Sequence, residues 1–411
     1  MEYDEFKKIV TENGQGHLVK LYERLDDAKR KKLLDQVSRI DFNKIDYLYS
    51  LTKEKKEFNN VNIKPIDACD ANNLSDEEKA RLRAIGIEAI QQGKLAVVMM
   101  AGGQGTRLGH SGPKGTFDFG LESHKSIFEV FADKFKDAEK EFGVIVPWYI
   151  MTSRENVRDT ITFFLEHNYF DYEDGIRTFF SQNELPMLDE NGKLIISEDG
   201  LVKEAANGHG GVFDALVSNM VLDQLKSMGI EWIFTCGVDN VLAKLVDPLL
   251  LGYAIDNNYK ATSVSCIKDY PEEKVGVLCY KDDKPSVVEY TELTDDLKYA
   301  KKESGELLFS ESHIMMNLFS TSVIEDISKK ELPYHVAHKK CDIIDEEGNV
   351  IKPDKPNAYK FETFIFDAFE RLPKLGVLRY KREECFAPIK NAEGADSPET
   401  ARKLYKAYYN L

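Results

Sequence analysis

Residues 95–115 read LAVVMMAGGQGTRLGHSGPKG. The first six residues are apolar throughout, which predicts a short strand buried on both faces of a sheet. Six glycines then fall between Gly102 and Gly115, and glycine allows a backbone to approach a ligand closely. Successive free N–H groups in such a loop form an anion-binding concavity, to which Arg107 and Lys114 add positive charge. The segment therefore predicts a strand followed by a polyphosphate-binding loop.

Two familiar nucleotide-binding patterns do not fit this loop. A Walker A loop ends in Gly-Lys-Ser or Gly-Lys-Thr, and the Gly-Lys pairs at Gly93 and Gly192 are followed by neither serine nor threonine. A dinucleotide fingerprint needs a third glycine where Leu108 stands. These residues exclude a P-loop kinase and an ordinary NAD site.

Short apolar segments alternate with amphipathic ones after residue 94, which is typical of an α/β fold covered on both faces of its sheet. Strands are expected at 95–100, 144–152, 176–180, 232–237, 262–267, 276–280 and 287–293. Helices are expected at 126–141, 154–167, 212–228, 248–257, 362–372 and in the tail at 397–411. Residues 1–60 carry apolar residues at helical spacing, and 75–93 read as a helix that starts with a Ser75–Glu78 capping box. We thus expect a helical region and linker at 1–93, a central α/β domain at 94–375 and a short C-terminal segment at 376–411.

The composition is that of an acidic globular protein of 411 residues. Its 55 basic and 71 acidic residues give a net charge of −16, which disfavours nucleic acids and anionic membranes as partners. The six cysteines are scattered without a CxxC pair, which indicates neither a disulfide framework nor a structural zinc site. The first residues carry no apolar secretory segment, and no apolar run reaches the length of a membrane span. A cytoplasmic location is therefore expected.

The glycine loop closely resembles the signature of the eukaryotic-type UDP-N-acetylhexosamine pyrophosphorylases, within the UTP:sugar-1-phosphate uridylyltransferases. Further blocks resemble this family in the same order, from about residue 16 to 406. They are WYIMTS (148–153), FFSQNELPML (179–188), NGHGGVFDAL (207–216), CGVDNVLAKLVDP (236–248), KVGVL (274–278), VVEYTEL (287–293), IKPDKPNAYKFETFIFD (351–367) and FAPIKNA (386–392). The resemblance implies a Rossmann-like nucleotidyltransferase core, similar to the GT-A fold, with a mixed sheet.

The resemblance also implies a reaction. The phosphate of a hexose 1-phosphate attacks the α-phosphorus of UTP in line, which gives a UDP-sugar and pyrophosphate. Such a reaction needs positioning and charge stabilisation rather than a protein nucleophile. Mg²⁺ is the implied cofactor, with Mn²⁺ as an alternative.

The nucleotide is assigned by this resemblance to glycine backbones and one glutamine. Gly102 and Gly103 would contact the uridine, Gln182 would read the uracil edge, and Gly208 would lie against the nucleotide. Gln182 could instead be an ordinary loop residue.

Four charged residues would serve the phosphates. Arg107 and Lys114 would hold the triphosphate and stabilise the departing pyrophosphate, and Lys390 would reach the bridging phosphate. Asp239 directly follows a predicted strand, where open α/β sheets bind ligands, and a carboxylate beside phosphates suits Mg²⁺. A helix-capping role is the alternative for Asp239.

Four further residues would form the sugar site. Glu289 would accept hydrogen bonds from sugar hydroxyls, and Gly276 would let the backbone close over the ring. His209 and His313 each replace an asparagine of the resembled family, as an equivalent hydrogen-bond donor or as a mark of a different sugar.

The expected substrates are therefore UTP and N-acetylglucosamine 1-phosphate. Glucose 1-phosphate or galactose 1-phosphate is the first alternative, and a non-catalytic protein that binds nucleotide sugars is the second. Longer members of the resembled family continue into a β-rich C-terminal domain, so we carry over no oligomer contacts and expect a monomer or a weak oligomer.

Overall fold

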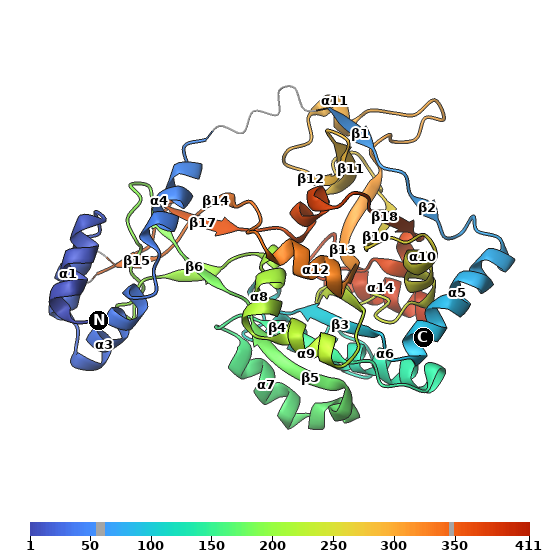
Figure 1. The fold of residues 1–411 in the computed structure, drawn as a ribbon, viewed down its shortest axis with the longest axis horizontal. Helices are drawn as coiled ribbons and strands as arrows, with labels where there is room; N and C mark the ends of the chain where they lie inside the picture. The colour runs from blue at the N-terminus through green and yellow to red at the C-terminus, as the bar shows by residue number, and fades with distance from the viewer. Residues whose placement is uncertain (55–61, 345–348) are drawn as a thin grey trace. The chain divides into compact units, whose positions relative to one another are not determined.

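The computed structural model describes residues 1–54, 62–344 and 349–411 (Figure 1). The chain forms two compact units. The smaller unit comprises Met1–Glu57, Asn183–Gly211 and Leu332–Phe364, and the larger unit comprises Phe58–Gln182, Val212–Glu331 and Ile365–Leu411. These units do not coincide with the expected segments 1–93, 94–375 and 376–411, because two central segments join the N-terminal helices.

The larger unit is built on a mixed sheet of eleven strands within the described residues. Eight of them follow the order β2 (Cys69–Asp70), β18 (Gly376–Arg379), β10 (Ala261–Ile267), β13 (Glu311–Ser320), β9 (Trp232–Gly237), β3 (Leu95–Met100), β4 (Trp148–Thr152), β5 (Ile176–Ser181). The other three are β1 (Ile63–Pro65), β11 (Val277–Lys281) and β12 (Lys284–Val288), of which β11 pairs with β13. Strands β9, β3, β4 and β5 are parallel, whereas β13 runs antiparallel to β9 and β10. The carboxyl ends of the parallel strands therefore meet at one edge of the sheet.

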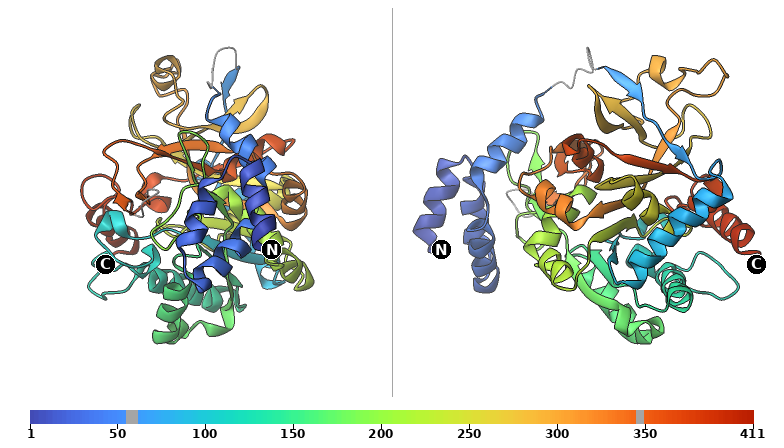
Figure 2. Two further views of the ribbon diagram at one scale, coloured as in Figure 1. Left: turned by 90° about the vertical axis from the view of Figure 1, so that its left-hand side faces the viewer. Right: turned by 45° about the vertical axis from the view of Figure 1, so that its right-hand side comes forward.

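Helices cover the sheet of the larger unit. They are α5 (Asp76–Gln91), α6 (Ile127–Phe142), α7 (Val157–Glu166), α8 (Val212–Ser218), α9 (Val221–Ser227), α10 (Pro248–Asp256), α11 (Asp295–Lys298), α12 (Thr321–Ser328), α13 (Arg382–Cys385) and α14 (Pro398–Tyr409). All six residues of β3 are buried, as its apolar sequence predicts. The aromatic side chains of Phe128, Phe135, Trp148 and Phe164 pack against one another in this core. Figure 2 shows the C-terminal helix α14 beside α5, and residues of both line one cavity.

The smaller unit joins four helices to short strands. The helices are α1 (Tyr3–Glu12), α2 (His17–Arg24), α3 (Asp27–Val37) and α4 (Phe42–Leu51). The strands are β6 (Glu184–Pro186), β7 (Leu188–Asp189), β8 (Glu204–Ala206), β14 (His335–Lys339), β15 (Ile343–Ile344), β16 (Val350–Ile351) and β17 (Ala358–Glu362). Phe6 and Leu48 from the helices share a hydrophobic core with Leu188 and Phe361 from the strands. Burial of these apolar side chains explains why distant segments of the chain form one unit.

The expected α/β class is confirmed, and β3 and β9 have the predicted bounds. The capping box of Ser75 and Glu78 is present at the start of α5. Across the part of the chain that the structure describes, no helix is long and apolar enough to cross a membrane.

Three expected elements are wrong. The helix expected at 212–228 is two helices, because Met220 adopts a left-handed backbone with φ 56°. The strand expected at 287–293 ends at Val288, where a turn bonds the N–H groups of Glu292 and Leu293 to the carbonyl of Glu289. The helix expected at 362–372 is instead the end of β17 followed by a 3-10 helix, Ile365–Arg371, because Glu362 pairs with β14.

Candidate active site

The glycine loop, Ala101–Gly115, leaves the carboxyl end of β3 and folds back on itself. The N–H of Gly105 donates to the carbonyl of Gly112 at 2.9 Å, and the N–H of Lys114 donates to the carbonyl of Gly103 at 3.0 Å. These two bonds bring Lys114 back towards the start of the loop. The loop is thus an ordered cradle of backbone groups, as an anion site requires.

A buried asparagine, which the sequence analysis missed, fastens the loop to the neighbouring strand. The Nδ2 of Asn156, a fully buried residue, donates to the carbonyl of Ala101 at 2.9 Å and lies 3.4 Å from that of Gly103. Its Oδ1 accepts a hydrogen bond from the N–H of Ser153 at 2.9 Å. Asn156 lies inside the expected helix 154–167, and only the nearness of that helix start to the end of the predicted strand 144–152, where ligand-binding residues gather, could have identified it.

Gln182 meets the loop at Gly102. Gln182 follows β5, is only 8% exposed, and its N–H donates to the carbonyl of Thr152 at 2.9 Å. A Cβ added at Gly102 would lie 2.5 Å from Nε2 of Gln182. The structure therefore brings together two of the predicted nucleotide-binding residues, and a side chain at position 102 would displace the Gln182 amide.

Asp239 lies in the turn after β9, at the same edge of the sheet as the glycine loop. Its side chain is half-buried, and in residues 1–54, 62–344 and 349–411 its carboxylate has no hydrogen-bond or ion-pair partner. Its backbone carbonyl accepts the N–H of Ile389 at 2.9 Å. This contact places Asp239 beside the segment that carries Lys390.

Lys390 and Arg107 line one cavity of about 650 Å³ in the larger unit. The wall also includes Phe386 and Asp396. The Nζ of Lys390 lies 3.7 Å from the carboxylate of Asp396 and 5.4 Å from the centre of the Phe386 ring. Two predicted phosphate-binding cations from distant parts of the chain thus share a space large enough for a ligand. Lys114 does not line this cavity.

Three of the four predicted sugar-binding residues lie together in the larger unit. The N–H of His313 donates to the carbonyl of Gly276 at 2.9 Å, and a Cβ added at Gly276 would lie 3.1 Å from Oε1 of Glu289. The His313 ring is buried, with Nε2 3.2 Å from Oδ1 of Asn317, and it lies nearly perpendicular to the ring of Phe366. These contacts fix the orientation of the His313 ring beside Gly276 and Glu289.

The remaining two predicted residues, Gly208 and His209, belong to the smaller unit. Gly208 has φ 84°, which favours glycine, and a Cβ added there would clash with the backbone carbonyl of Thr363. The ring of His209 stacks on Phe364 with centroids 5.1 Å apart, and Phe364 stacks on His335 at 4.2 Å. The structure thus gives His209 a defined place in an aromatic stack.

A partly buried carboxylate, that of Glu362, lies near this stack. Burial alone would raise the pKa of Glu362, but the Lys360 ammonium 2.7 Å away, together with Lys339 and His209, holds that pKa below its usual value. The carboxylate of Glu362 is therefore charged near neutral pH and paired within the smaller unit.

Comparison with known proteins gives a consistent result. The family model described as UTP–glucose-1-phosphate uridylyltransferase matches residues 41–396. The UDP-N-acetylglucosamine pyrophosphorylase of Saccharomyces cerevisiae is 34% identical over 97% of this chain and 88% of its own length. The UDP-N-acetylglucosamine diphosphorylase 2 of Arabidopsis thaliana is 34% identical over 95% of this chain and 81% of its own.

A solved structure agrees with these matches. The uridine diphosphate N-acetylglucosamine pyrophosphorylase of Trypanosoma brucei, in complex with an inhibitor, superposes with a TM-score of 0.83 and 30% identity. The match covers 98% of this chain and 84% of that one. These matches show that the chain, with its glycine loop at the end of β3, is a nucleotidyltransferase that belongs to the UTP–glucose-1-phosphate uridylyltransferase family.

Proposed function

We propose that this protein transfers the uridylyl group of UTP to N-acetylglucosamine 1-phosphate. A phosphate oxygen of the sugar phosphate forms a bond to the α-phosphorus of UTP. The bond from that phosphorus to the oxygen of the β-phosphate breaks, and its electron pair leaves with pyrophosphate. The observation that carries the proposal is the cavity that Arg107 and Lys390 share, in a chain whose relatives are named for this sugar nucleotide.

The glycine loop and Gln182 form the nucleotide end of the proposed site. A buried amide beside Gly102 offers both a donor and an acceptor, which is what the edge of a uracil requires. The backbone of Gly102 and Gly103 would contact the nucleoside. Arg107 and Lys114 would contact the β- and γ-phosphates and stabilise the charge of the departing pyrophosphate.

Lys390 supplies the charge for the transition state in this proposal. Negative charge gathers on the oxygens around the α-phosphorus as the new bond forms, and a fixed ammonium lowers the energy of that state. Its ion pair with Asp396 is long, at 3.7 Å, so a phosphate can replace the carboxylate as its partner.

The carboxylate of Asp239 would bind a magnesium ion. It is half-buried at the edge of the sheet and has no hydrogen-bond or ion-pair partner among the described residues. No group of three or more acidic, histidine or cysteine side chains that could hold a metal occurs among the described residues. One carboxylate together with phosphate oxygens and water is the set of ligands that Mg²⁺ prefers. Mg²⁺, or Mn²⁺ in its place, would neutralise charge on the phosphates.

The sugar would lie against Gly276, Glu289 and His313. We favour N-acetylglucosamine 1-phosphate because the relatives that cover most of the chain bear that name. Glucose 1-phosphate or galactose 1-phosphate is the second candidate, favoured by the two histidines at 209 and 313 where the resembled family has asparagines. A neutral histidine offers one donor and one acceptor, so it can bond a hydroxyl as well as an acetamido group.

Pyrophosphate release tests the proposal directly. The protein is assayed with UTP, Mg²⁺ and, in turn, the 1-phosphates of N-acetylglucosamine, N-acetylgalactosamine, glucose and galactose. We expect the N-acetylglucosamine substrate to give a kcat/KM at least about 10-fold above glucose, because a pocket shaped for one group discriminates by roughly this factor. Faster turnover of glucose 1-phosphate or galactose 1-phosphate would mean that His209 and His313 mark a specificity for that sugar instead. No release with any sugar would favour a non-catalytic binding protein.

Replacing Gln182 with alanine should weaken recognition of the base. The variant leaves the base without its amide partner, so KM for UTP should rise by about 10-fold, equivalent to one hydrogen bond of roughly 1.4 kcal/mol. The preference for UTP over CTP should fall with it, whereas the KM for the sugar phosphate should not change. An unchanged ratio of kcat/KM for UTP and CTP would contradict the assignment of Gln182 to the uracil.

We expect the protein to act in the cytoplasm as a monomer or weak oligomer, without nucleic-acid or membrane partners. All six cysteines are free thiols, which suits a reducing compartment.

A further inference from the structure

Asn240 follows Asp239 directly and is almost completely buried, with 4% exposure. Its Nδ2 donates to the carbonyl of Cys385 at 2.8 Å. Its Oδ1 accepts the N–H of Ala387 at 2.9 Å and that of Leu242 at 3.3 Å. The side-chain amide therefore holds its own turn and the segment that leads to Lys390 at the same time.

Backbone contacts continue this link on both sides of the amide. Asn240 and Pro388 form an antiparallel bridge, and the N–H of Val241 donates to the carbonyl of Ala387 at 3.3 Å. The N–H of Ile389 donates to the carbonyl of Asp239 at 2.9 Å. Lys390 is the next residue in the chain, so the proposed metal ligand and the proposed catalytic lysine lie at neighbouring ends of two paired segments.

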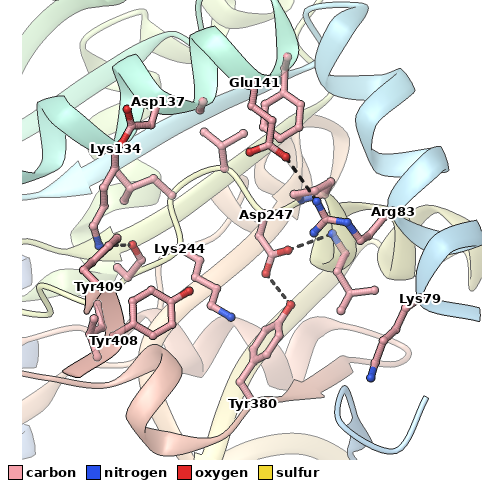
Figure 3. A pocket seen from close by; sticks show the side chains of 18 residues that line it. Lys79, Arg83, Lys134, Asp137, Glu141, Lys244, Asp247, Tyr380, Tyr408 and Tyr409 are labelled. Carbon is pink, nitrogen blue, oxygen red and sulfur yellow. Dashed lines mark hydrogen bonds and ion pairs between the residues drawn. The ribbon is translucent and has the colours of Figure 1, made fainter. Parts of the chain in front are cut away.

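The same turn is held from behind by Lys134 of α6. The Nζ of Lys134 donates to the carbonyl of Val241 at 2.6 Å and to that of Ala243 at 2.9 Å. Figure 3 shows Lys134 extending from its helix among the side chains that line a cavity of about 440 Å³. Burial lowers the pKa of Lys134 to about 7, and a neutral amine still has two N–H groups for the two carbonyls. Lys134 can therefore hold the turn at Val241–Ala243 whether its amine is charged or neutral.

We propose that Asn240 is a positioning residue that sets the distance between Asp239 and Lys390. This inference rests on the proposed function. The amide adds no charge to the reacting phosphates. It acts through Lys390, because loss of its two-sided hydrogen bonding would free the segment at 385–389 to shift relative to the turn at 239. Misplacement of a catalytic group by about 1 Å can cost roughly 100-fold in rate.

The test uses the variants Asn240→Ala and Asn240→Asp of the full chain. For Asn240→Ala, kcat should fall by about 100-fold while KM for UTP changes less than about threefold, because the nucleotide end is left intact. Asn240→Asp has the same shape and keeps the acceptor for Ala387, but it cannot donate to Cys385 when ionised. Its kcat should lie between those of Asn240→Ala and the wild type.

Asn357 offers a matched control in the smaller unit. Its amide bonds both sides of Cys341, with Oδ1 accepting the N–H at 2.8 Å and Nδ2 donating to the carbonyl at 2.9 Å. Asn357→Ala removes the same kind of hydrogen-bond pair from a segment that does not carry Lys390. It should lower the thermal midpoint, by less than Asn240→Ala because Asn357 is only half-buried, and leave kcat within about twofold of the wild type.

Two further measurements separate positioning from a loss of stability. Amide hydrogen exchange over residues 385–390 should quicken in Asn240→Ala and not in Asn357→Ala. The double variant of Asn240→Ala with Lys390→Ala should be no slower than Lys390→Ala alone, because residues that act as a unit are not additive.

The outcomes distinguish this inference from the proposed function. A wild-type chain that transfers no uridylyl group would overturn both. An active wild type in which Asn240→Ala keeps the kcat of Asn357→Ala, or in which the double variant shows additive losses, would overturn the inference about Asn240 alone.

Discussion

Replacement of Lys390 with alanine should reduce kcat by about 100- to 1000-fold, the usual cost of removing one group that stabilises transition-state charge. Lys390 lines the cavity with Arg107, and its pairing with Asp396 at 3.7 Å leaves it able to change partner when a phosphate arrives. The nucleotide end of the site, at Gly102 and Gln182, does not depend on this lysine. The KM for UTP should therefore stay within about threefold, since the lost interaction belongs to the transition state.

Lys406 provides the matched control for this variant. Its side chain is 32% exposed and pairs with Glu122 at 2.8 Å, whereas that of Lys390 is 36% exposed. Lys406→Ala removes a comparable ion pair from the surface and should leave kcat and the thermal midpoint nearly unchanged, because exposed pairs contribute roughly 0–1 kcal/mol. Equal turnover by Lys390→Ala and Lys406→Ala would end the catalytic assignment of Lys390.

Gly102→Ala should raise KM for UTP by roughly 10- to 100-fold, since overpacking at a close contact costs about 1–3 kcal/mol. A methyl group at this position would lie 2.5 Å from Nε2 of Gln182 and 3.3 Å from the N–H nitrogen of Ser153. The glutamine amide must then leave its place, and the loop must move away from the β4 end. Measured UTP binding by calorimetry should show the same loss as KM.

Gly16→Ala is the control for adding a methyl group. A Cβ at Gly16 meets no atom within 4 Å, so UTP binding should not change. The double variant Gly102→Ala with Gln182→Ala distinguishes the cause of the effect. If contact with the glutamine is the reason, the double variant should bind UTP about as weakly as Gln182→Ala. If the losses of UTP affinity in the two single variants add in the double variant, Gly102→Ala acts through the backbone of the loop instead.

The sequence predicts the centre of the larger unit well because its signals are local. The apolar run at 95–100 is typical of a buried strand, and the serine–glutamate capping box at 75–78 is contained within one turn of helix. The break at Met220 could not be read, because a left-handed methionine breaks no local pattern in the sequence. Segments 183–211 and 332–364 join the N-terminal helices through side chains such as Phe361 and Leu188, and no local pattern predicts such contacts.

In the candidate site too, some residues could be predicted from the sequence and others only from the fold. Its charged residues were found because each belongs to a block that resembles a known family, and Arg107 and Lys390 do share a cavity. The amides of Asn156 and Asn240 were missed because an asparagine after a strand has several ordinary roles. Only the fold shows that one holds the glycine loop and the other holds the lysine segment.

Uridylyl transfer by this protein is tested most directly by the fate of a label at the α-phosphorus of UTP. The protein is incubated with α-labelled UTP, N-acetylglucosamine 1-phosphate and Mg²⁺, and the products are separated by chromatography. We predict that the label appears in UDP-N-acetylglucosamine in step with the release of unlabelled pyrophosphate, and that neither product forms without the sugar phosphate. Label that remains in UTP, or that appears in UMP at a rate independent of the sugar phosphate, would contradict uridylyl transfer by this protein.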